Sequence, residues 1–146
     1  MVGADVIYYS ASGAPAQEAY HQVDFDTLLS ESDILSIHAP LNEHTEGIMN
    51  AEAFQKMKSS AILLNLGRGP IVNEADLAAA LNAGEVKAAG LDVLCTEPMA
   101  NDNPLLTVVD KSRLLITPHI AWAAVETRQR LMHIIEGQIQ EFFDLK

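Results

Sequence analysis

Arg68 is the first residue whose setting suggests chemistry, because it lies between Gly67 and Gly69 directly after an apolar run. Two glycines let the backbone turn sharply and approach a ligand closely, and a guanidinium can bind a carboxylate through two parallel hydrogen bonds. An arginine in an ordinary turn, paired with a surface acid, explains the pattern equally well. The stretch does not predict a pyrophosphate-binding loop, since Val72 stands where a third glycine would be and Pro70 lacks an N–H.

Two carboxylates accompany the next apolar run, residues 88–94. Asp92 lies inside this run, and a carboxylate in a buried strand needs a partner, which could be a polar ligand or backbone N–H groups. Glu97 follows the run and precedes Pro98. A carboxylate there could orient a histidine and raise its basicity. For this position alone, the alternative is a solvated loop glutamate.

His119 follows Thr117 and a proline at the end of a further apolar run. Histidine is the side chain best suited to move a proton near neutral pH, although a structural histidine or a helix-start cap would give the same pattern. His38 has no evident acid or base partner and is expected to line a wall of the site. Cys95 lacks an activating base and is expected to do the same. The spacing of His, Cys and Asp residues predicts no metal site.

Near-continuous apolar runs predict five buried β-strands, at Asp5–Tyr9, Asp33–His38, Ala61–Leu66, Ala88–Leu94 and Leu114–Thr117. Helical signals lie between or after them, at Asp24–Ser30, Ala51–Met57, Asn73–Ala83 and Val125–Asp144. This alternation predicts an α/β fold, a doubly wound parallel sheet of about five strands that is flanked by helices and covered on both faces. Ligands bind beyond the carboxyl ends of such strands, where the candidate residues stand.

Two of these helices carry clear local signals. Asn73 is predicted to cap its helix, with Asp76 at the third position for a reciprocal bond and Gly84 at the end. The last helix places four apolar residues on one stripe, Leu131, Ile135, Ile139 and Phe142.

Composition excludes several classes of protein. The formal net charge is −11 and there is no basic cluster, so no nucleic-acid partner is expected. The longest apolar runs have the length of strands, so neither a membrane span nor a signal peptide is expected. Cys95 is the only cysteine and allows no intrachain disulfide, which favours a reducing compartment and a cytoplasmic protein.

Three segments resemble, in order and spacing, the signatures of the D-isomer-specific 2-hydroxyacid dehydrogenases. They are residues 65–74 around Arg68, residues 90–93 followed by Glu97, and residues 117–122 around His119. The resemblance runs over essentially the whole chain. The residues in these segments are most similar to those of the glycerate dehydrogenase and hydroxypyruvate reductase branch. It implies a Rossmann-like domain and an NAD(P)-dependent oxidoreductase that interconverts D-2-hydroxyacids and 2-oxoacids, with a small substrate such as hydroxypyruvate or glyoxylate.

The resemblance also implies a role for each matching residue. Arg68 would bind the substrate carboxylate and polarise the C2 oxygen, and His119 would be the acid/base. Glu97 would hold His119 in orientation and tune its pKa. Asp92 would face the nicotinamide carboxamide. The other residues expected to contact the cofactor are Ser10, His38, Ala39, Pro40, Thr45, Leu66, Gly67 and Ala121.

The 146 residues depart from the family at their start. The opening strand, GxGxxG loop and helix of the cofactor domain are absent, as is the separate substrate domain, so 1–146 is expected to be a partial dinucleotide-binding domain. Without the helix N-terminus that would hold the pyrophosphate, we expect weak or no binding of NAD or NADP. Ser10 stands where the family has an acid that binds the adenine ribose, which leaves the choice of cofactor open.

The absent strand would lie beside Asp5–Tyr9, and its loss would expose strand edges that invite pairing with another chain. We therefore expect a homodimer, a swapped oligomer or a rearranged, flavodoxin-like strand order. The leading hypothesis is a dehydrogenase whose activity is impaired in this chain. The alternative is a non-catalytic α/β remnant or an interaction module that self-associates.

Overall fold

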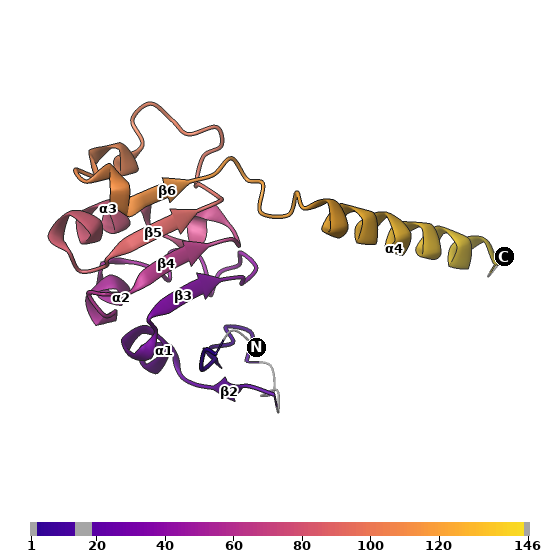
Figure 1. Ribbon diagram of the computed structural model, residues 1–146, viewed down its shortest axis with the longest axis horizontal. Helices are drawn as coiled ribbons and strands as arrows, with labels where there is room; N and C mark the ends of the chain where they lie inside the picture. Colours follow the sequence, from indigo (N-terminus) through magenta and orange to yellow (C-terminus); the bar gives the residue numbers. More distant parts are fainter. Residues whose placement is uncertain (1–2, 14–18, 145–146) are drawn as a thin grey trace.

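The computed structural model describes residues 3–13 and 19–144 and shows an α/β arrangement (Figure 1). The strands are β1 (Ile7–Tyr8), β2 (His21–Gln22), β3 (Ile34–Ile37), β4 (Ile62–Asn65), β5 (Ala88–Leu91) and β6 (Leu114–Ile116). The α-helices are α1 (Phe25–Glu31), α2 (Ala51–Lys56), α3 (Glu74–Ala83) and α4 (Val125–Asp144). Short 3₁₀ turns are η1 (Gly69–Ile71), η2 (Pro104–Thr107) and η3 (Lys111–Arg113).

The strands form two parallel sheets. Strands β3, β4, β5 and β6 lie in that order in one sheet, and β1 pairs with β2 in a second, two-stranded sheet. The predicted α/β class with a parallel sheet is confirmed. The five predicted strands do not all lie in one sheet, because β1 pairs with β2, a short polar strand that has no apolar run to indicate it. A flavodoxin-like order is not formed in the described residues either, since β1 does not pair with β3.

The core lies on one face of the four-stranded sheet. Helix α2 contacts both α1 and α3, and one apolar cluster joins their buried residues, Phe54 and Leu77 among them, to Leu35 and Leu63 of the strands. Burying each such side chain contributes about 1.5–3 kcal/mol. Burial therefore alternates along β3, whose Ile34 is 63% exposed. The expectation of strands covered on both faces was wrong, because no described helix covers the second face.

Helix α4 has the bounds that the sequence predicts, but it leaves the body of the molecule and projects into solvent (Figure 1). None of its residues is buried. The predicted apolar stripe is therefore exposed, because no other described segment packs against it. Within the described ranges, no helix has the length and apolar character needed to cross a membrane.

Helix α3 is capped as predicted at both ends. Asn73 Oδ1 accepts hydrogen bonds from the first turn, and Gly84 ends the helix in the left-handed region at φ 79°. The reciprocal bond predicted for Asp76 is not formed. The Asn73 N–H donates to Met49 O at 2.9 Å, and Asp76 Oδ2 accepts from Ala51 N at 3.1 Å. Asp76 thus joins the start of α3 to the start of α2, a tertiary contact that local spacing does not indicate.

Candidate active site

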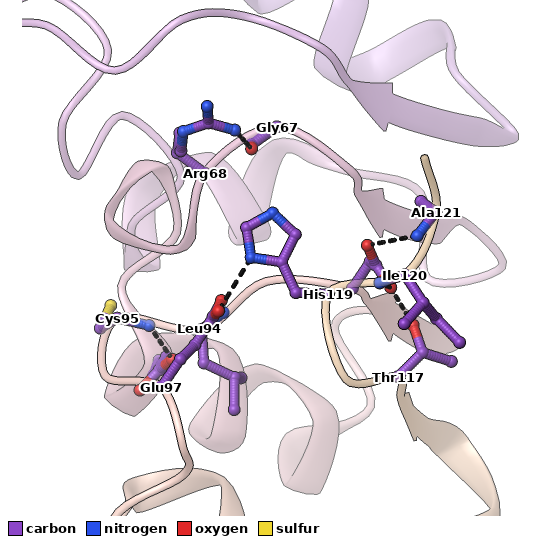
Figure 2. Close-up of polar contacts among 11 residues, drawn as sticks. Gly67, Arg68, Leu94, Cys95, Glu97, Thr117, His119, Ile120 and Ala121 are labelled. Carbon is purple, nitrogen blue, oxygen red and sulfur yellow. Dashed lines mark hydrogen bonds and ion pairs between the residues drawn. The ribbon is translucent and has the colours of Figure 1, made fainter. Parts of the chain in front are cut away.

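A histidine–glutamate pair lies beyond the carboxyl ends of β5 and β6. His119 Nδ1 is 2.8 Å from Glu97 Oε2, and Glu97 Oε1 accepts a hydrogen bond from Leu94 N at 2.9 Å (Figure 2). The Leu94 N–H, followed by the bond from His119, holds the pKa of Glu97 below its ordinary value. Glu97 is therefore an acceptor at neutral pH. The two residues that the sequence proposed as orienting acid and proton carrier are in direct contact.

This contact sets the chemical state of the imidazole. A carboxylate has no proton to give, so Nδ1 of His119 carries the hydrogen in the bond to Glu97. Nε2 of His119 has no hydrogen bond within the described residues. It is therefore the ring atom free to give or take a proton. The side chains of His119 and Glu97 are 42% and 38% exposed, so a ligand can reach the pair.

Asp92 holds the loop that carries His119. Strand β5 ends at Leu91, so Asp92 stands just beyond the strand and not inside it as predicted. The residue is 3% exposed, and its carboxylate accepts hydrogen bonds from Thr117 Oγ1, Ile120 N at 2.9 Å and Ala121 N at 2.8 Å. Desolvation alone would raise the pKa of Asp92, but these hydrogen bonds outweigh it and lower the pKa. Of the two kinds of partner considered for Asp92, the structure shows backbone donors together with a hydroxyl.

His119 occupies an unusual backbone conformation at the centre of this loop. Its φ is 55°, in the left-handed region that costs a non-glycine residue about 1–2 kcal/mol. The bonds from Asp92 to the two N–H groups that follow His119, together with the bond from His119 N to Thr117 O at 3.0 Å, hold the strained turn. Asp92 therefore fixes the backbone of His119, whereas Glu97 fixes its ring.

Arg68 lies in the loop after β4, and its side chain is exposed. Its Nη1 donates to Gly67 O at 2.8 Å. The buried Asn65 holds this turn from below, because its Nδ2 donates to Arg68 O at 3.0 Å and its Oδ1 accepts from Gly67 N at 3.1 Å. Sequence reasoning missed Asn65, although a polar residue at the end of an apolar strand was the available signal.

The two glycines beside Arg68 are required by packing between loops. A Cβ at Gly67 would lie 3.0 Å from the backbone oxygen of Ala39, in the loop after β3. A Cβ at Gly69 would lie 2.0 Å from the carbonyl carbon and oxygen of Leu94 and 2.5 Å from Cys95 N, in the loop after β5. The Arg68 loop thus touches the loops on both sides of it. The sequence suggested that these glycines allow a sharp turn and a close approach to a ligand, and the structure shows that they allow a close approach of backbone to backbone within the protein.

The remaining predicted residues border three hollows at the carboxyl ends of the strands. A cavity of about 390 Å³ has walls that include Ser10, His38, Ala39, Pro40 and Thr45. A hollow of about 470 Å³ shares three of these residues and adds Leu66, Gly67 and Arg68. A third, of about 490 Å³, is bordered by Asp92, Glu97 and His119. Ala121 lies outside the three hollows.

Two of the cavity residues also serve the chain itself. Thr45 is buried; its hydroxyl donates to Pro40 O at 2.7 Å and accepts from Asn42 N at 2.9 Å, so it holds the turn that forms the wall. His38 Nε2 is 2.9 Å from Ser36 Oγ. Neither side chain contacts an acidic or basic group in the described residues. Both are therefore placed to shape a binding surface.

Cys95 lies in the loop after β5, close to the buried carboxylate of Glu74. Desolvation, followed by the nearby Glu74 carboxylate, raises the pKa of the Cys95 thiol to about 11. The thiol is therefore protonated at neutral pH, the state that is inert as a nucleophile. Within residues 3–13 and 19–144, no three His, Cys, Asp or Glu side chains are grouped as metal ligands would be.

Comparison with known families decides the relationship of the chain. Residues 1–121 match the family described as D-isomer specific 2-hydroxyacid dehydrogenase, NAD binding domain. The chain belongs to this family. The match includes Arg68, Glu97 and His119, and it ends shortly before α4 begins.

Individual relatives agree with the family. A hydroxypyruvate reductase from Blautia hydrogenotrophica is 48% identical over 143 residues, which are 97% of this chain and 44% of that protein. An acyclic imino acid reductase solved with NADPH and D-Arg superposes with a TM-score of 0.83 at 31% identity, over 97% of this chain and 44% of that one. The NAD complex of a D-isomer specific 2-hydroxyacid dehydrogenase from Lactobacillus delbrueckii ssp. bulgaricus gives 0.79 at 32% identity, over 94% and 45%. The chain thus spans less than half the length of these relatives.

Proposed function

We propose that this chain carries the acid/base and carboxylate-binding groups of an NAD(P)-dependent oxidoreductase that interconverts D-2-hydroxyacids and 2-oxoacids. The observation that carries the proposal is the pairing of His119 with Glu97, which leaves Nε2 of the imidazole free beside a hollow. The bound nicotinamide would supply a hydride to C2 of the 2-oxoacid, or accept one from the hydroxyacid. The residues of this chain would handle the proton and the substrate's charge.

His119 is suited to the proton step in both directions. In the reduction, Nε2–H of the imidazolium donates its proton to the oxygen that develops negative charge, and in the oxidation neutral Nε2 accepts the hydroxyl proton. Glu97 stabilises the imidazolium through the 2.8 Å contact at Nδ1 and keeps the ring in one orientation. A positioned acid/base of this kind contributes about 10²–10⁴-fold in rate.

Arg68 is suited to bind the substrate carboxylate. Its guanidinium is exposed beyond β4 and has one hydrogen bond, to Gly67 O, among those found in the described residues. A guanidinium has five N–H donors, so several remain to grip a carboxylate through two parallel bonds. We propose that this contact also places the C2 oxygen for the proton from His119.

The cavity near β1 and β3 fits the adenosine end of a dinucleotide. Its apolar walls, which include Phe25 and Leu28, carry a few polar groups such as Ser10 and His38, the pattern of a small-molecule pocket. The neighbouring hollow leads from the same wall to Arg68. The 146 residues contain no GxGxxG loop, so we propose that this chain by itself binds NAD or NADP weakly.

The names of the relatives suggest the substrate. They include the hydroxypyruvate reductase above and a glyoxylate/hydroxypyruvate reductase B from Cronobacter sakazakii that is 49% identical over 108 residues. We propose that this chain derives from an enzyme that acts on short 2-oxoacids of the hydroxypyruvate and glyoxylate type.

The test is NADH and NADPH titration by fluorescence, followed by an assay of cofactor oxidation with hydroxypyruvate. We expect weak binding and slow oxidation that His119→Ala reduces by about 10²-fold or more. His133→Ala is the matched control, because His133 is exposed on α4, away from the site. A folded chain that neither binds cofactor at millimolar concentration nor oxidises it would refute the proposal for these 146 residues.

A second candidate function, self-association, is favoured by the exposed apolar surfaces. Ile34 and Leu115 of the open sheet face are 63% and 66% exposed, and the α4 stripe, which includes Ile139, also faces solvent. We propose that copies of the chain pair through these surfaces as a dimer or swapped oligomer. Light scattering after size exclusion should show a dimer for the wild type and for the control Gln138→Asp, and a monomer for Ile139→Asp. A wild-type chain that stays monomeric at all concentrations tested would contradict the proposed self-association.

A further inference from the structure

A buried polar cluster outside the site connects the loops of the candidate catalytic residues. Glu74, the first residue of α3, is 8% exposed. Its Oε1 accepts a hydrogen bond from Cys95 N at 2.8 Å, and its Oε2 accepts one from Asn103 Nδ2 at 2.8 Å. Both oxygens of the carboxylate are therefore committed to the loop between β5 and β6.

The cluster holds the peptide group that directly follows the one whose N–H donates to Glu97. Leu94 N–H donates to Glu97, and the next N–H along the chain, that of Cys95, donates to Glu74. The same Leu94–Cys95 peptide lies against Gly69, next to Arg68. One side of this peptide is fixed by packing and its N–H by a buried carboxylate. Its orientation depends on both, and through the shared Cα of Leu94 it affects the preceding Val93–Leu94 peptide, whose N–H donates to Glu97.

We propose that Glu74, assisted by Asn103, is a positioning residue for the proposed reaction. It touches none of the reacting groups. It fixes the Leu94–Cys95 peptide so that Glu97 faces His119 while the Arg68 loop stays against the same peptide. This role rests on the proposed function, because positioning Glu97 matters only if His119 transfers a proton. The effect of Glu74 on the geometry of Glu97 can nevertheless be measured without any reaction.

The hydrogen-bond polarity requires a carboxylate at position 74. Asn103 Oδ1 accepts from Leu105 N at 2.9 Å, which leaves its amino group to face Glu74. Both partners of Glu74 are therefore donors. In Glu74→Gln, one oxygen becomes an amino group that opposes either the Cys95 N–H or the Asn103 amino group, and a buried bond is lost. In Glu74→Gln combined with Asn103→Asp, donor and acceptor exchange places, and every bond can form again.

The experiment measures the carboxyl titration of Glu97 by ¹³C NMR on the labelled full chain. In the wild type we expect the pKa of Glu97 to lie below 4.5, because of the Leu94 N–H and His119. In Glu74→Gln the displaced peptide weakens the bond to Glu97, so its pKa should rise toward 4.5. The double variant should restore the wild-type value. Glu136→Gln, an exposed change on α4, is the control and should have no effect.

Stability is measured on the same samples by thermal unfolding. A loss of stability in Glu74→Gln with an unchanged Glu97 titration would mean a purely structural role and would overturn the proposal. Failure of the double variant to restore the titration would overturn it too. If Glu74→Gln does not fold, the same titration of Glu97 is measured in Asn103→Ser. The serine hydroxyl can still cap η2, but it is too short to reach Glu74, so only the bond to Glu74 is lost. An unchanged Glu97 titration in that variant also overturns it. Because no cofactor or substrate is needed, the outcome is independent of the test of the proposed function.

Discussion

Gly69→Ala isolates the contact between the Arg68 loop and the Glu97 loop. Gly69 does not have a positive φ, so alanine is allowed by its backbone conformation. The obstacle is space, because the added methyl group would lie 2.0 Å from the carbonyl of Leu94 and 2.5 Å from Cys95 N. These neighbours are backbone atoms and cannot rotate away as a side chain would. The two loops must separate by about 1.5 Å to restore ordinary contact distances.

The size of the effect follows from what this separation breaks. Overpacking of a close contact costs about 1–3 kcal/mol. Two consecutive N–H groups at this contact, those of Leu94 and Cys95, donate to Glu97 and to the buried Glu74, and weakening a buried hydrogen bond of this kind costs about 1–3 kcal/mol more. We therefore expect Gly69→Ala to lower the free energy of unfolding by about 2–5 kcal/mol.

Urea unfolding followed by circular dichroism measures this loss, and Gly137→Ala is the matched control. Gly137 lies in α4, where an added methyl group meets nothing within 4 Å. The control should raise helicity, since alanine is favoured over glycine in a helix by about 1 kcal/mol. It should leave unfolding of the sheet unchanged, because α4 does not pack on it. A Gly69→Ala variant as stable as the wild type, with an unchanged Glu97 titration, would refute the reasoning.

Three further changes test other contacts. Asp92→Asn should cost about 1–3 kcal/mol at pH 7, because an amide replaces an acceptor that faces three donors. Since folding lowers the pKa of Asp92, its contribution is present above pH 3.8 and is lost as the pH falls through the folded-state value. Urea unfolding between pH 3 and 7 should show a shallower acid loss in the variant, and parallel curves would contradict this. The Cys95 thiol should react slowly with a disulfide reagent at pH 7.5 and faster as the pH approaches 11, whereas the urea-unfolded chain should react fast throughout. Equal reaction rates for the folded and the unfolded chain at pH 7.5 would show that the folded chain has an accessible thiolate and would contradict the prediction. Arg113→Lys should cost about 1–3 kcal/mol in unfolding free energy, because lysine cannot donate to the three carbonyls that Arg113 binds. Arg128→Lys, an exposed change on α4, should cost nothing.

Much of the fold follows from local signals in the sequence. Asn73 and Gly84 mark the ends of α3 because capping depends on residues within one turn of the helix. The apolar runs locate β3 to β6, although the run at 88–94 overstates β5, whose last residue is Leu91. A run shows that residues are buried, but it does not show where ladder bonding stops. The pair His21–Gln22 forms a strand that no apolar pattern could indicate, because its pairing with β1 decides it.

The candidate site follows the same division. The sequence predicted that Arg68, Glu97 and His119 lie at the carboxyl edge of a parallel sheet, because each follows an apolar run and such strands all end at one edge. It did not indicate Asn65 or Glu74. Their roles depend on hydrogen bonds across loops, and a buried polar residue has no periodic signature.

The sequence by itself therefore determined which residues could do chemistry and on which edge they stand. The types of residue and the one-dimensional alternation of strands and helices carry that information. Only the tertiary structure decided that Glu97 accepts from both Leu94 and His119, and that the glycines beside Arg68 serve loop packing. It also decided that α4 and the second sheet face lie open. Such features depend on distances between segments far apart in the chain, which local propensity does not contain.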